Sequence, residues 1–144
     1  MNRLSKRSAD RLDGVLPILK KIFIEGVKDS PYDFGIPGTG GLRTDQDQID
    51  MYAIGRTVKM NRTPVTWTLN SNHKAKADGF GYAVDIYAYI GGKASWNMRY
   101  LKPIARHLQK FALENYDVTL EWGYDLWRKD GAHFQIKYNG EENL

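Results

Sequence analysis

The chain has 144 residues, of which 42% are hydrophobic and 12% aromatic, a composition that suits one folded, soluble domain with a single core. Cysteine is absent, which excludes disulfides and thiolate metal ligands and leaves only imidazole and oxygen ligands for a metal ion. The net charge of +4 favours an anionic partner such as nucleic acid, a membrane surface or a bacterial envelope, but the basic residues are scattered, so an ordinary surface explains it equally well.

The first third of the chain predicts two helices that flank a short strand. Its polar N-terminus contains no hydrophobic signal region, and no apolar run approaches about 18 residues, so we expect a cytosolic product without stable membrane insertion. Apolar residues at helical spacing predict a helix over 8–28, followed by a strand over 32–36 and a glycine-rich turn over 37–41. A second helix is predicted to begin after Thr44 and to end near Gly55, with these apolar residues facing the core: Ile49, Met51, Tyr52 and Ile54.

The rest of the chain predicts strands around one further helix. The helix covers about 97–115, and residues 73–81 form a polar, glycine-containing loop. Strands are predicted at four stretches, the first of them the least regular: 65–69, 82–90, 118–122 and 133–138. This order of elements predicts an α+β fold in which a small antiparallel sheet packs against helices.

Three residues offer side chains that could bind a metal ion. Asp85 interrupts a strongly apolar strand, where a carboxylate is costly unless a cation or a strong donor meets it. Alone, Asp85 is explained by a structural salt bridge, and His73 and His133 by ordinary packing. Together they make a three-ligand set that leaves a fourth position for water, as catalytic zinc requires. The remaining histidine, His107, lies among polar residues of the third predicted helix and is expected to serve the surface or packing.

Several stretches in sequential order resemble one family. Residues 71–73 (SNH) and 81–85 (GYAVD) are similar to the S-x-H…G-x-A-x-D motif of the peptidoglycan-cleaving zinc peptidases, which include D,D-carboxypeptidases and phage endolysins. Residues 122–125 (WGYD) and 130–135 (DGAHFQ) resemble the W-G-x-D…D-x-x-H-F-Q ending of that family. Residues 41–57 are similar to the G-x-R-T…Q…Y-x-x-G-R-T stretch of its phage members. In the usual pattern two residues separate the first histidine from the glycine, whereas seven do so here, and a longer loop costs little if its ends stay close.

The resemblance implies a D,D-peptidase or hedgehog-like zinc fold and a single catalytic domain over residues 1–144, without a separate wall-binding domain. It assigns Zn²⁺ to His73, Asp85 and His133. It also implies that Asp130 is the general base, since an aspartate at this position is similar to the endopeptidase endolysins. Glu121 and Asp125 are the other nearby carboxylates, and Asp125 is expected to hold its loop by hydrogen bonds.

The resemblance also implies residues that contact the substrate. Arg43 corresponds to an arginine that binds the substrate carboxylate and steadies the oxyanion, roles that suit a bidentate cation. Ser71 corresponds to a substrate contact, with a local hydrogen bond to its loop as the alternative. Aromatic side chains could line a groove for a peptide and its sugar, although in a small core they mostly serve packing: Tyr82, Tyr87, Tyr89, Trp122 and Trp127.

The activity implied is hydrolysis of the L-alanyl-D-glutamate bond in the peptide stem of bacterial peptidoglycan, by a phage endolysin that lyses its host. We expect a monomer with no nucleic-acid partner, which stays in the host cytoplasm until a separate pore gives it access to the periplasm and the cell wall. Two alternatives stay open. One is a D,D- or L,D-carboxypeptidase on wall peptides, and the other is a non-catalytic wall-binding module of the same fold.

Overall fold

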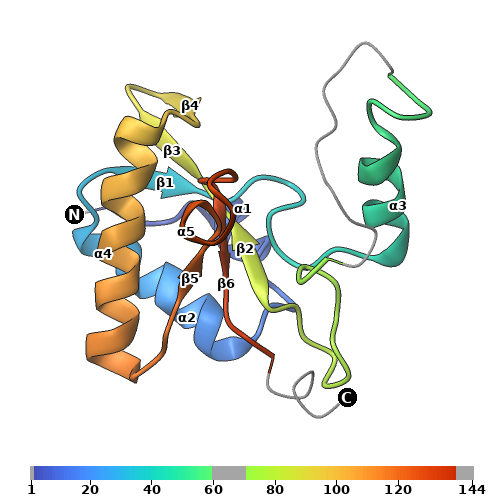
Figure 1. The fold of residues 1–144 in the computed structure, drawn as a ribbon. Helices are drawn as coiled ribbons and strands as arrows, with labels where there is room; N and C mark the ends of the chain where they lie inside the picture. The colour runs from blue at the N-terminus through green and yellow to red at the C-terminus, as the bar shows by residue number, and fades with distance from the viewer. Residues whose placement is uncertain (1, 60–70, 139–144) are drawn as a thin grey trace.

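The computed structural model describes residues 2–59 and 71–138, and it has an α+β architecture (Figure 1). The helices are α1 (Lys6–Asp10), α2 (Pro17–Gly26), the short 3₁₀ helix η1 (Val27–Asp29), α3 (Asp45–Ala53), α4 (Met98–Tyr116) and α5 (Gly123–Trp127). The strands are β1 (Asp33–Gly35), β2 (Ala83–Asp85), β3 (Tyr87–Ile90), β4 (Lys93–Ser95), β5 (Glu121–Trp122) and β6 (His133–Gln135). The predicted strand over 65–69 lies outside the described residues.

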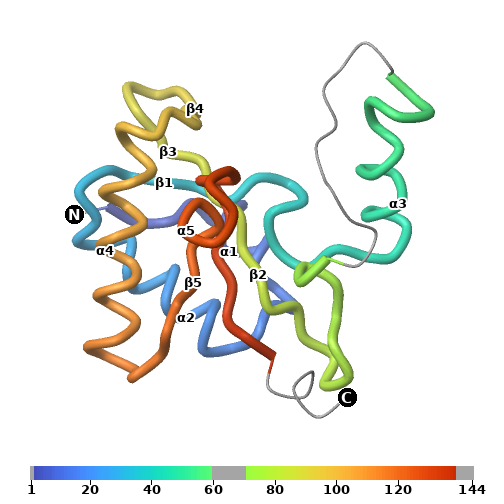
Figure 2. Tube along the Cα trace, viewed as in Figure 1, coloured from blue at the N-terminus to red at the C-terminus, as the bar shows by residue number. Residues whose placement is uncertain are grey.

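The strands form two antiparallel sheets instead of the single small sheet expected. One sheet has the order β1-β3-β4, and the other has the order β2-β6-β5. The prediction of one continuous strand over 82–90 is therefore wrong, because the chain leaves the second sheet at Asp85 and joins the first at Tyr87, as the path of the tube shows (Figure 2). At the break, the Asp85 N–H donates to the Gly40 carbonyl over 2.8 Å, and the Ile86 N–H donates to the Ala132 carbonyl over 3.0 Å.

The single N-terminal helix predicted over 8–28 is also wrong, because the chain turns between α1 and α2. Gly14 has φ +86°, a left-handed conformation that favours glycine, and a side chain there would collide with Leu42. Pro17 then occupies the first turn of α2, where its fixed φ suits a helix and its missing N–H costs nothing. The helical spacing of apolar residues survives this turn because both helices face the same core.

The third predicted helix is confirmed as α4, which begins and ends at clear signals. The Asn97 side chain accepts from the Arg99 N–H at its N-terminus, and Asp117 adopts a left-handed conformation at its C-terminus. The strand before it is missing from the prediction. Gly91 and Gly92, both with positive φ, turn the chain back so that β4 pairs with β3.

The hydrophobic core lies between the two sheets and the helices α2 and α4. Phe23 on α2 meets Phe134 on β6 edge to face, with ring centroids 5.5 Å apart. The largest fully buried apolar side chains are Leu12, Leu19, Ile22, Phe23, Ile36, Ile86, Leu101, Ile104, Leu108, Trp122 and Phe134. Together they hold the strands that carry the functional side chains.

Helix α3 stands apart from this core (Figure 1). Its start is as predicted, because Thr44 forms a capping box with Asp47. The predicted core-facing side of the helix is wrong, since Ile49 is 51% exposed and Gln48 is the buried residue of the helix. None of the helices in the two described ranges is long and apolar enough to cross a membrane.

Candidate metal centre

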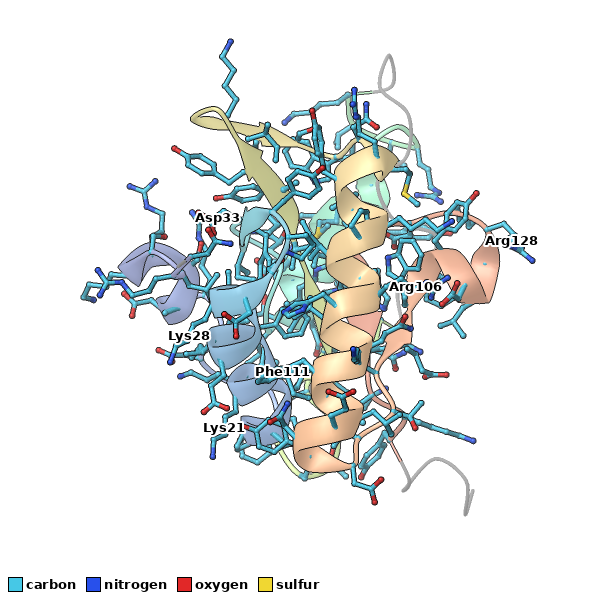
Figure 3. The ribbon with its side chains drawn as sticks, turned by 90° about the vertical axis from the view of Figure 1, so that its left-hand side faces the viewer. Lys21, Lys28, Asp33, Arg106, Phe111 and Arg128 are labelled. Atoms are coloured by element: carbon cyan, nitrogen blue, oxygen red, sulfur yellow. The ribbon has the colours of Figure 1, made fainter. Side chains whose placement is uncertain are left out.

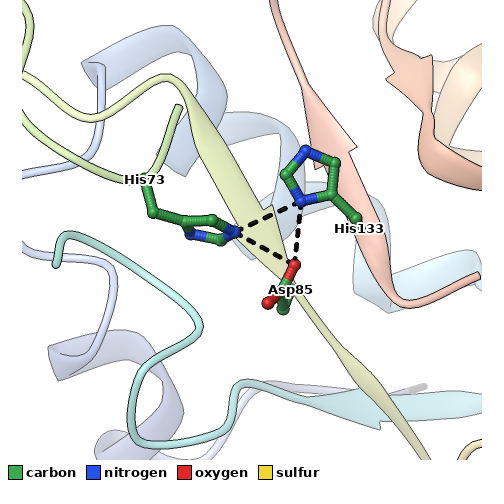
Figure 4. A group of neighbouring side chains, drawn as sticks. All are labelled: His73, Asp85 and His133. Carbon is green, nitrogen blue, oxygen red and sulfur yellow. Dashed lines mark hydrogen bonds and ion pairs between the residues drawn. The ribbon is translucent and has the colours of Figure 1, made fainter. Parts of the chain in front are cut away.

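His73, Asp85 and His133 come together as predicted (Figure 4). The distance from His73 Nε2 to Asp85 Oδ1 is 3.1 Å, that from His133 Nδ1 to the same oxygen is 3.1 Å, and the two nitrogens lie 3.2 Å apart. Both imidazole rings are buried. The three atoms therefore form a nearly equilateral triangle in the interior of the protein.

Strand pairing explains two corners of this triangle. Asp85 and His133 are direct partners across the antiparallel pair of β2 and β6, so their side chains stand on the same face of the sheet. His73 arrives from the loop before β2. The Tyr82 N–H donates to the Asn72 carbonyl over 2.9 Å, which keeps the two ends of the lengthened 74–80 loop close together. The longer loop thus leaves the first histidine in place.

Each histidine forms a hydrogen bond with its other ring nitrogen to a residue outside the cluster, and this bond determines which nitrogen faces the centre of the triangle. His73 Nδ1 lies 3.0 Å from the Gly41 carbonyl oxygen, which can only accept, so Nδ1 carries the proton and Nε2 keeps its lone pair. His133 Nε2 lies 2.8 Å from Gln135 Oε1, so it carries the proton and Nδ1 keeps its lone pair. Two nitrogen lone pairs and a carboxylate oxygen then converge, an arrangement that suits a metal cation at their centre.

The donor set and its spacing fit Zn²⁺. Tetrahedral zinc with bonds of about 2.0–2.1 Å to nitrogen and oxygen places its ligands about 3.3–3.4 Å apart. The observed edges of 3.1–3.2 Å are close to this spacing. Three protein ligands leave one position for water or substrate, as in catalytic zinc sites. The cluster fits a zinc site, and His73, Asp85 and His133 would hold the ion.

Titration behaviour supports the same conclusion. Burial lowers the pKa of His73, which favours the neutral ring that a metal ion needs. Burial alone would raise the pKa of the Asp85 carboxyl, but the neighbouring histidines outweigh it and hold that pKa well below its usual range. Burial lowers the pKa of His133, but the contacts with Asp85 and Gln135 and the charge of Asp130 together outweigh it, so the net direction is upward. The centre therefore attracts positive charge.

Arg43 contacts Asp85 at Oδ2, the carboxylate oxygen that does not face the two histidines. Its Nη2 donates to Asp85 Oδ2 over 2.8 Å, while Nε donates to the Thr39 carbonyl and Nη1 to Gln48 Oε1. The side chain is only 6% exposed. A guanidinium fixed at three points orients the carboxylate so that Oδ1 faces the centre. Its predicted contact with the substrate stays a prediction.

Asp130 lies close enough to the cluster to interact electrostatically with its three residues. It precedes His133 by a short turn in which the His133 N–H donates to the Asp130 carbonyl, and it adopts a left-handed φ of +64°. The residue is exposed, yet partial loss of hydration, followed by the negative charge of Asp85, raises the pKa of its carboxyl. An accessible carboxylate with a raised pKa has the properties of a general base.

The other sequence candidates have structural contacts. The Ser71 hydroxyl accepts from the His73 N–H over 3.1 Å, which is the local hydrogen bond of the alternative explanation, and its contact with the substrate stays a prediction. Asp125 receives both Nη1 and Nη2 of Arg106, so it ties α5 to α4. The His107 ring meets the Gly26 carbonyl between α4 and α2, as expected of a packing residue.

The aromatic residues predicted to line a groove differ in burial and in their distance from the cluster. Trp122 is buried, and its indole N–H donates to the Gly131 carbonyl, so it belongs to the core. Trp127 is 45% exposed, with its ring centroid 5.3 Å from that of His133, and it stands beside the zinc site. Tyr82 is buried and bonded to Asp78 over 2.5 Å. Tyr87 and Tyr89 both lie on β3, and Tyr89 is 46% exposed.

Sequence reasoning missed the role of the residues that hold the His133 ring in its orientation. Gln135 Oε1 accepts from His133 Nε2 and from Asn72 Nδ2, and Gln135 Nε2 donates to Glu121 Oε1 over 3.2 Å. Gln135 and Glu121 are register partners across β5 and β6. Two signals were available: Gln135 is the last residue of the H-F-Q motif, and its i, i+2 spacing from His133 places both side chains on one face of a strand.

Comparisons with known proteins agree with this geometry. Residues 1–140 match the family model described as phage L-alanyl-D-glutamate peptidase. The crystal structure of Serratia marcescens L-Ala D-Glu endopeptidase ChiX is similar at 29% sequence identity and a TM-score of 0.75, covering 98% of this chain and 93% of ChiX. The vancomycin resistance D,D-dipeptidase VanXYg, in complex with a D-Ala-D-Ala phosphinate analog, matches at 16% identity and a TM-score of 0.46, covering 89% of this chain and 53% of VanXYg. No curated protein matches. The match to ChiX confirms the predicted α+β fold.

Proposed function

The chain belongs to the phage L-alanyl-D-glutamate peptidase family, and from that premise we propose that it is a zinc-dependent endopeptidase that cleaves the L-alanyl-D-glutamate bond in the peptide stem of bacterial peptidoglycan. The observation that carries the proposal is the buried triangle of two histidine nitrogens and one carboxylate oxygen, held by outer partners so that three lone pairs converge. The similarity to ChiX, whose printed description is an L-Ala D-Glu endopeptidase, supports the choice of bond.

The residues of the chain divide the chemistry among them. When bound at His73, Asp85 and His133, Zn²⁺ supplies a Lewis acid that polarises a carbonyl and lowers the pKa of water. Asp130 takes a proton from the attacking water and then gives it to the amine that leaves. Arg43 keeps Asp85 in position and adds positive charge near the oxygen on which negative charge develops.

We propose a phage lysis enzyme as the biological setting, and the family's phage description supports it. In this setting the protein stays in the host cytoplasm as a monomer until a separate pore gives it access to the wall. Host lysis is checked by adding the purified protein to permeabilised cells and following turbidity with and without a chelator.

The test of the activity is digestion of purified peptidoglycan, with the products identified by mass spectrometry. The expected products are stem peptides that begin with D-glutamate and sugar strands that keep L-alanine. Release of free D-alanine alone would contradict the endopeptidase and indicate a carboxypeptidase. The chelated protein and Asp130→Asn should release far less product than the unmodified chain, whereas Asp29→Asn, which changes an exposed carboxylate on η1, should match it.

If chelation and Asp130→Asn both leave digestion and lysis unchanged, the catalytic proposal is wrong and a wall-binding module becomes the better explanation. Metal analysis of the purified protein gives an independent check. One equivalent of zinc is expected, and its loss in His73→Ala would assign the first ligand. Retention of a full equivalent in that variant would place the ligand elsewhere.

A further inference from the structure

A second concave site lies outside the zinc centre. A cavity of about 930 Å³ separates the N-terminal segment and α1 from strands β1 and β3. Figure 3 shows Asp33 at this side of the molecule, between α1 and the β3–β4 hairpin. The side chains that matter for its chemistry are Arg3, Lys6, Arg7, Arg11, Tyr87 and Tyr89. We call this cavity the basic groove.

The basic groove concentrates positive charge. It is lined by four cations, Arg3, Lys6, Arg7 and Arg11, and by one carboxylate, Asp33, which gives a local charge of 4 − 1 = +3. The whole chain carries +4. Lys6 pairs with Asp10 outside the lining, which weakens its contribution. Arg3 and Arg7 are exposed, and among the described residues no carboxylate forms an ion pair with either, so both guanidinium groups can bind an anion.

Two tyrosines on one face of β3 form the opposite wall. Tyr87 and Tyr89 are two residues apart, so their side chains leave the strand on the same side. A side chain at Gly35 would collide with the Tyr87 ring, so the glycine on β1 allows that ring to lie across the neighbouring strand. Tyr89 is 46% exposed. A tyrosine offers an apolar ring and a polar tip, which suits a ligand with ring surfaces and hydroxyl groups.

Short links join the basic groove to the zinc site. Arg11 Nη1 donates to the Ile36 carbonyl over 2.8 Å, at the start of the 37–41 loop. Gly40 in that loop accepts from the Asp85 N–H, and Gly41 accepts from His73 Nδ1. The segment 36–41 therefore contacts the groove residue Arg11 at one end and two of the proposed zinc ligands at the other.

We infer that the basic groove binds the peptidoglycan polymer away from the bond that is cut, through carboxylates of the stem peptides with the tyrosines against the sugars. The inference rests on the proposed function and extends it. A wall polymer repeats its acidic peptides along sugar strands, so a groove with cations on one wall and aromatic rings on the other matches both of its chemical parts. Such a site holds the enzyme on its insoluble substrate without touching the scissile bond.

The test separates polymer binding from chemistry. Arg3→Gln/Arg7→Gln is compared with a control pair, Lys28→Gln/Lys102→Gln, which removes the same charge from exposed positions outside the groove. Circular dichroism establishes that both variants are folded. Binding to purified peptidoglycan sacculi is measured by sedimentation in the Asp130→Asn background, and kcat/KM is measured on a short soluble stem peptide with Asp130 intact.

The groove pair should bind sacculi about three- to tenfold more weakly at low salt, and the difference should shrink at high salt. Its kcat/KM on the soluble peptide should stay within twofold of the unmodified chain, as should binding by the control pair. Tyr89→Ala should weaken binding at both salt concentrations. Equal losses in the two pairs would overturn the inference in favour of general charge attraction, and unchanged binding would overturn it outright.

Two further results distinguish other failures. Binding of an oligonucleotide as tight as binding of sacculi, and lost in the same groove variant, would assign the groove to nucleic acid and overturn the inference. Absence of cleavage of the soluble peptide by the unmodified chain would contradict the proposed function alone, because sedimentation does not depend on turnover. The two proposals can therefore fail separately.

Discussion

Replacement of Gln135 by methionine should weaken zinc binding although Gln135 is not a ligand. Its Oε1 accepts from the buried His133 Nε2 over 2.8 Å, and methionine keeps the length of the side chain while removing this acceptor. A buried donor left without a partner costs about 1–3 kcal/mol. At about 1.4 kcal/mol per tenfold change, this range corresponds to about 5- to 150-fold in Kd, in line with the 10- to 100-fold loss of affinity that is typical of outer-shell changes.

The assay is competition for Zn²⁺ against a chromophoric chelator at fixed pH. A matched control is Gln109→Met on α4, because the Gln109 amide is hydrogen-bonded too, donating to the Leu120 carbonyl, but is not bonded to any of the three zinc ligands. The Gln109→Met variant should have the same zinc Kd as the unmodified chain. Asn72→Ala removes only a partner of Gln135 and should give a smaller loss than Gln135→Met. A folded Gln135→Met variant with the zinc Kd of the unmodified chain would refute the argument that this amide selects the nitrogen facing the metal.

Further predictions concern three other groups: Asp130, Arg43 and Tyr82. Asp130→Asn should lower kcat/KM about 10²- to 10⁴-fold while zinc content stays at one equivalent. In the unmodified chain, kcat/KM should rise with pH through a pKa above the usual aspartate range, because the base acts when ionised and its pKa is raised. Arg43→Lys should lower zinc affinity about tenfold, since an ammonium cannot replace a fork fixed at three acceptors, and the same chelator competition measures it. The pKa of Tyr82 is raised to about 12, so its protonated hydroxyl stabilises the fold fully below about pH 10, the unfolded value, and this stabilisation is lost as the pH rises toward 12. Tyr82→Phe should thus reduce the free energy of unfolding by about 0.5–1.5 kcal/mol at pH 8 and flatten its fall above pH 10, as measured by urea unfolding.

The zinc ligands could be predicted because the three residues fit a zinc site as a set and each falls in a motif of the family that the sequence resembles. The carboxylate of Asp85 inside an apolar strand adds a local signal, since it needs a cation or a strong donor. Taken singly, none of the three residues would have identified the site. What the residues could not give by themselves is the choice of ring nitrogen, because it depends on Gly41 and Gln135, which are brought to the rings by folding.

The errors in the fold arise where the outcome depends on tertiary contacts or where an element is too short to show a period. Alternation with period two reports which side chains face the interior and not which strand is the neighbour, so residues 82–90 look the same whether they lie in one sheet or two. Helix α5 has only five residues, too few for a helical period to show. Ile49 suggested a buried face on α3, but the helix stands away from the core, and burial is a property of tertiary contacts.

The break between β2 and β3 is also what assembles the site. Where the chain leaves one sheet for the other, the backbone N–H groups of Asp85 and Ile86 must find acceptors outside a regular ladder. Their acceptors are the carbonyls of Gly40 and Ala132. Gly40 adjoins the segment that holds His73 and carries Arg43, and Ala132 lies between Asp130 and His133. The hydrogen bonds that these two N–H groups form therefore bring His73, Arg43 and Asp130 close to Asp85. A side chain at Gly40 would lie 2.8 Å from the Asp85 carbonyl oxygen, so that position must stay small for the loop to reach the strand at all.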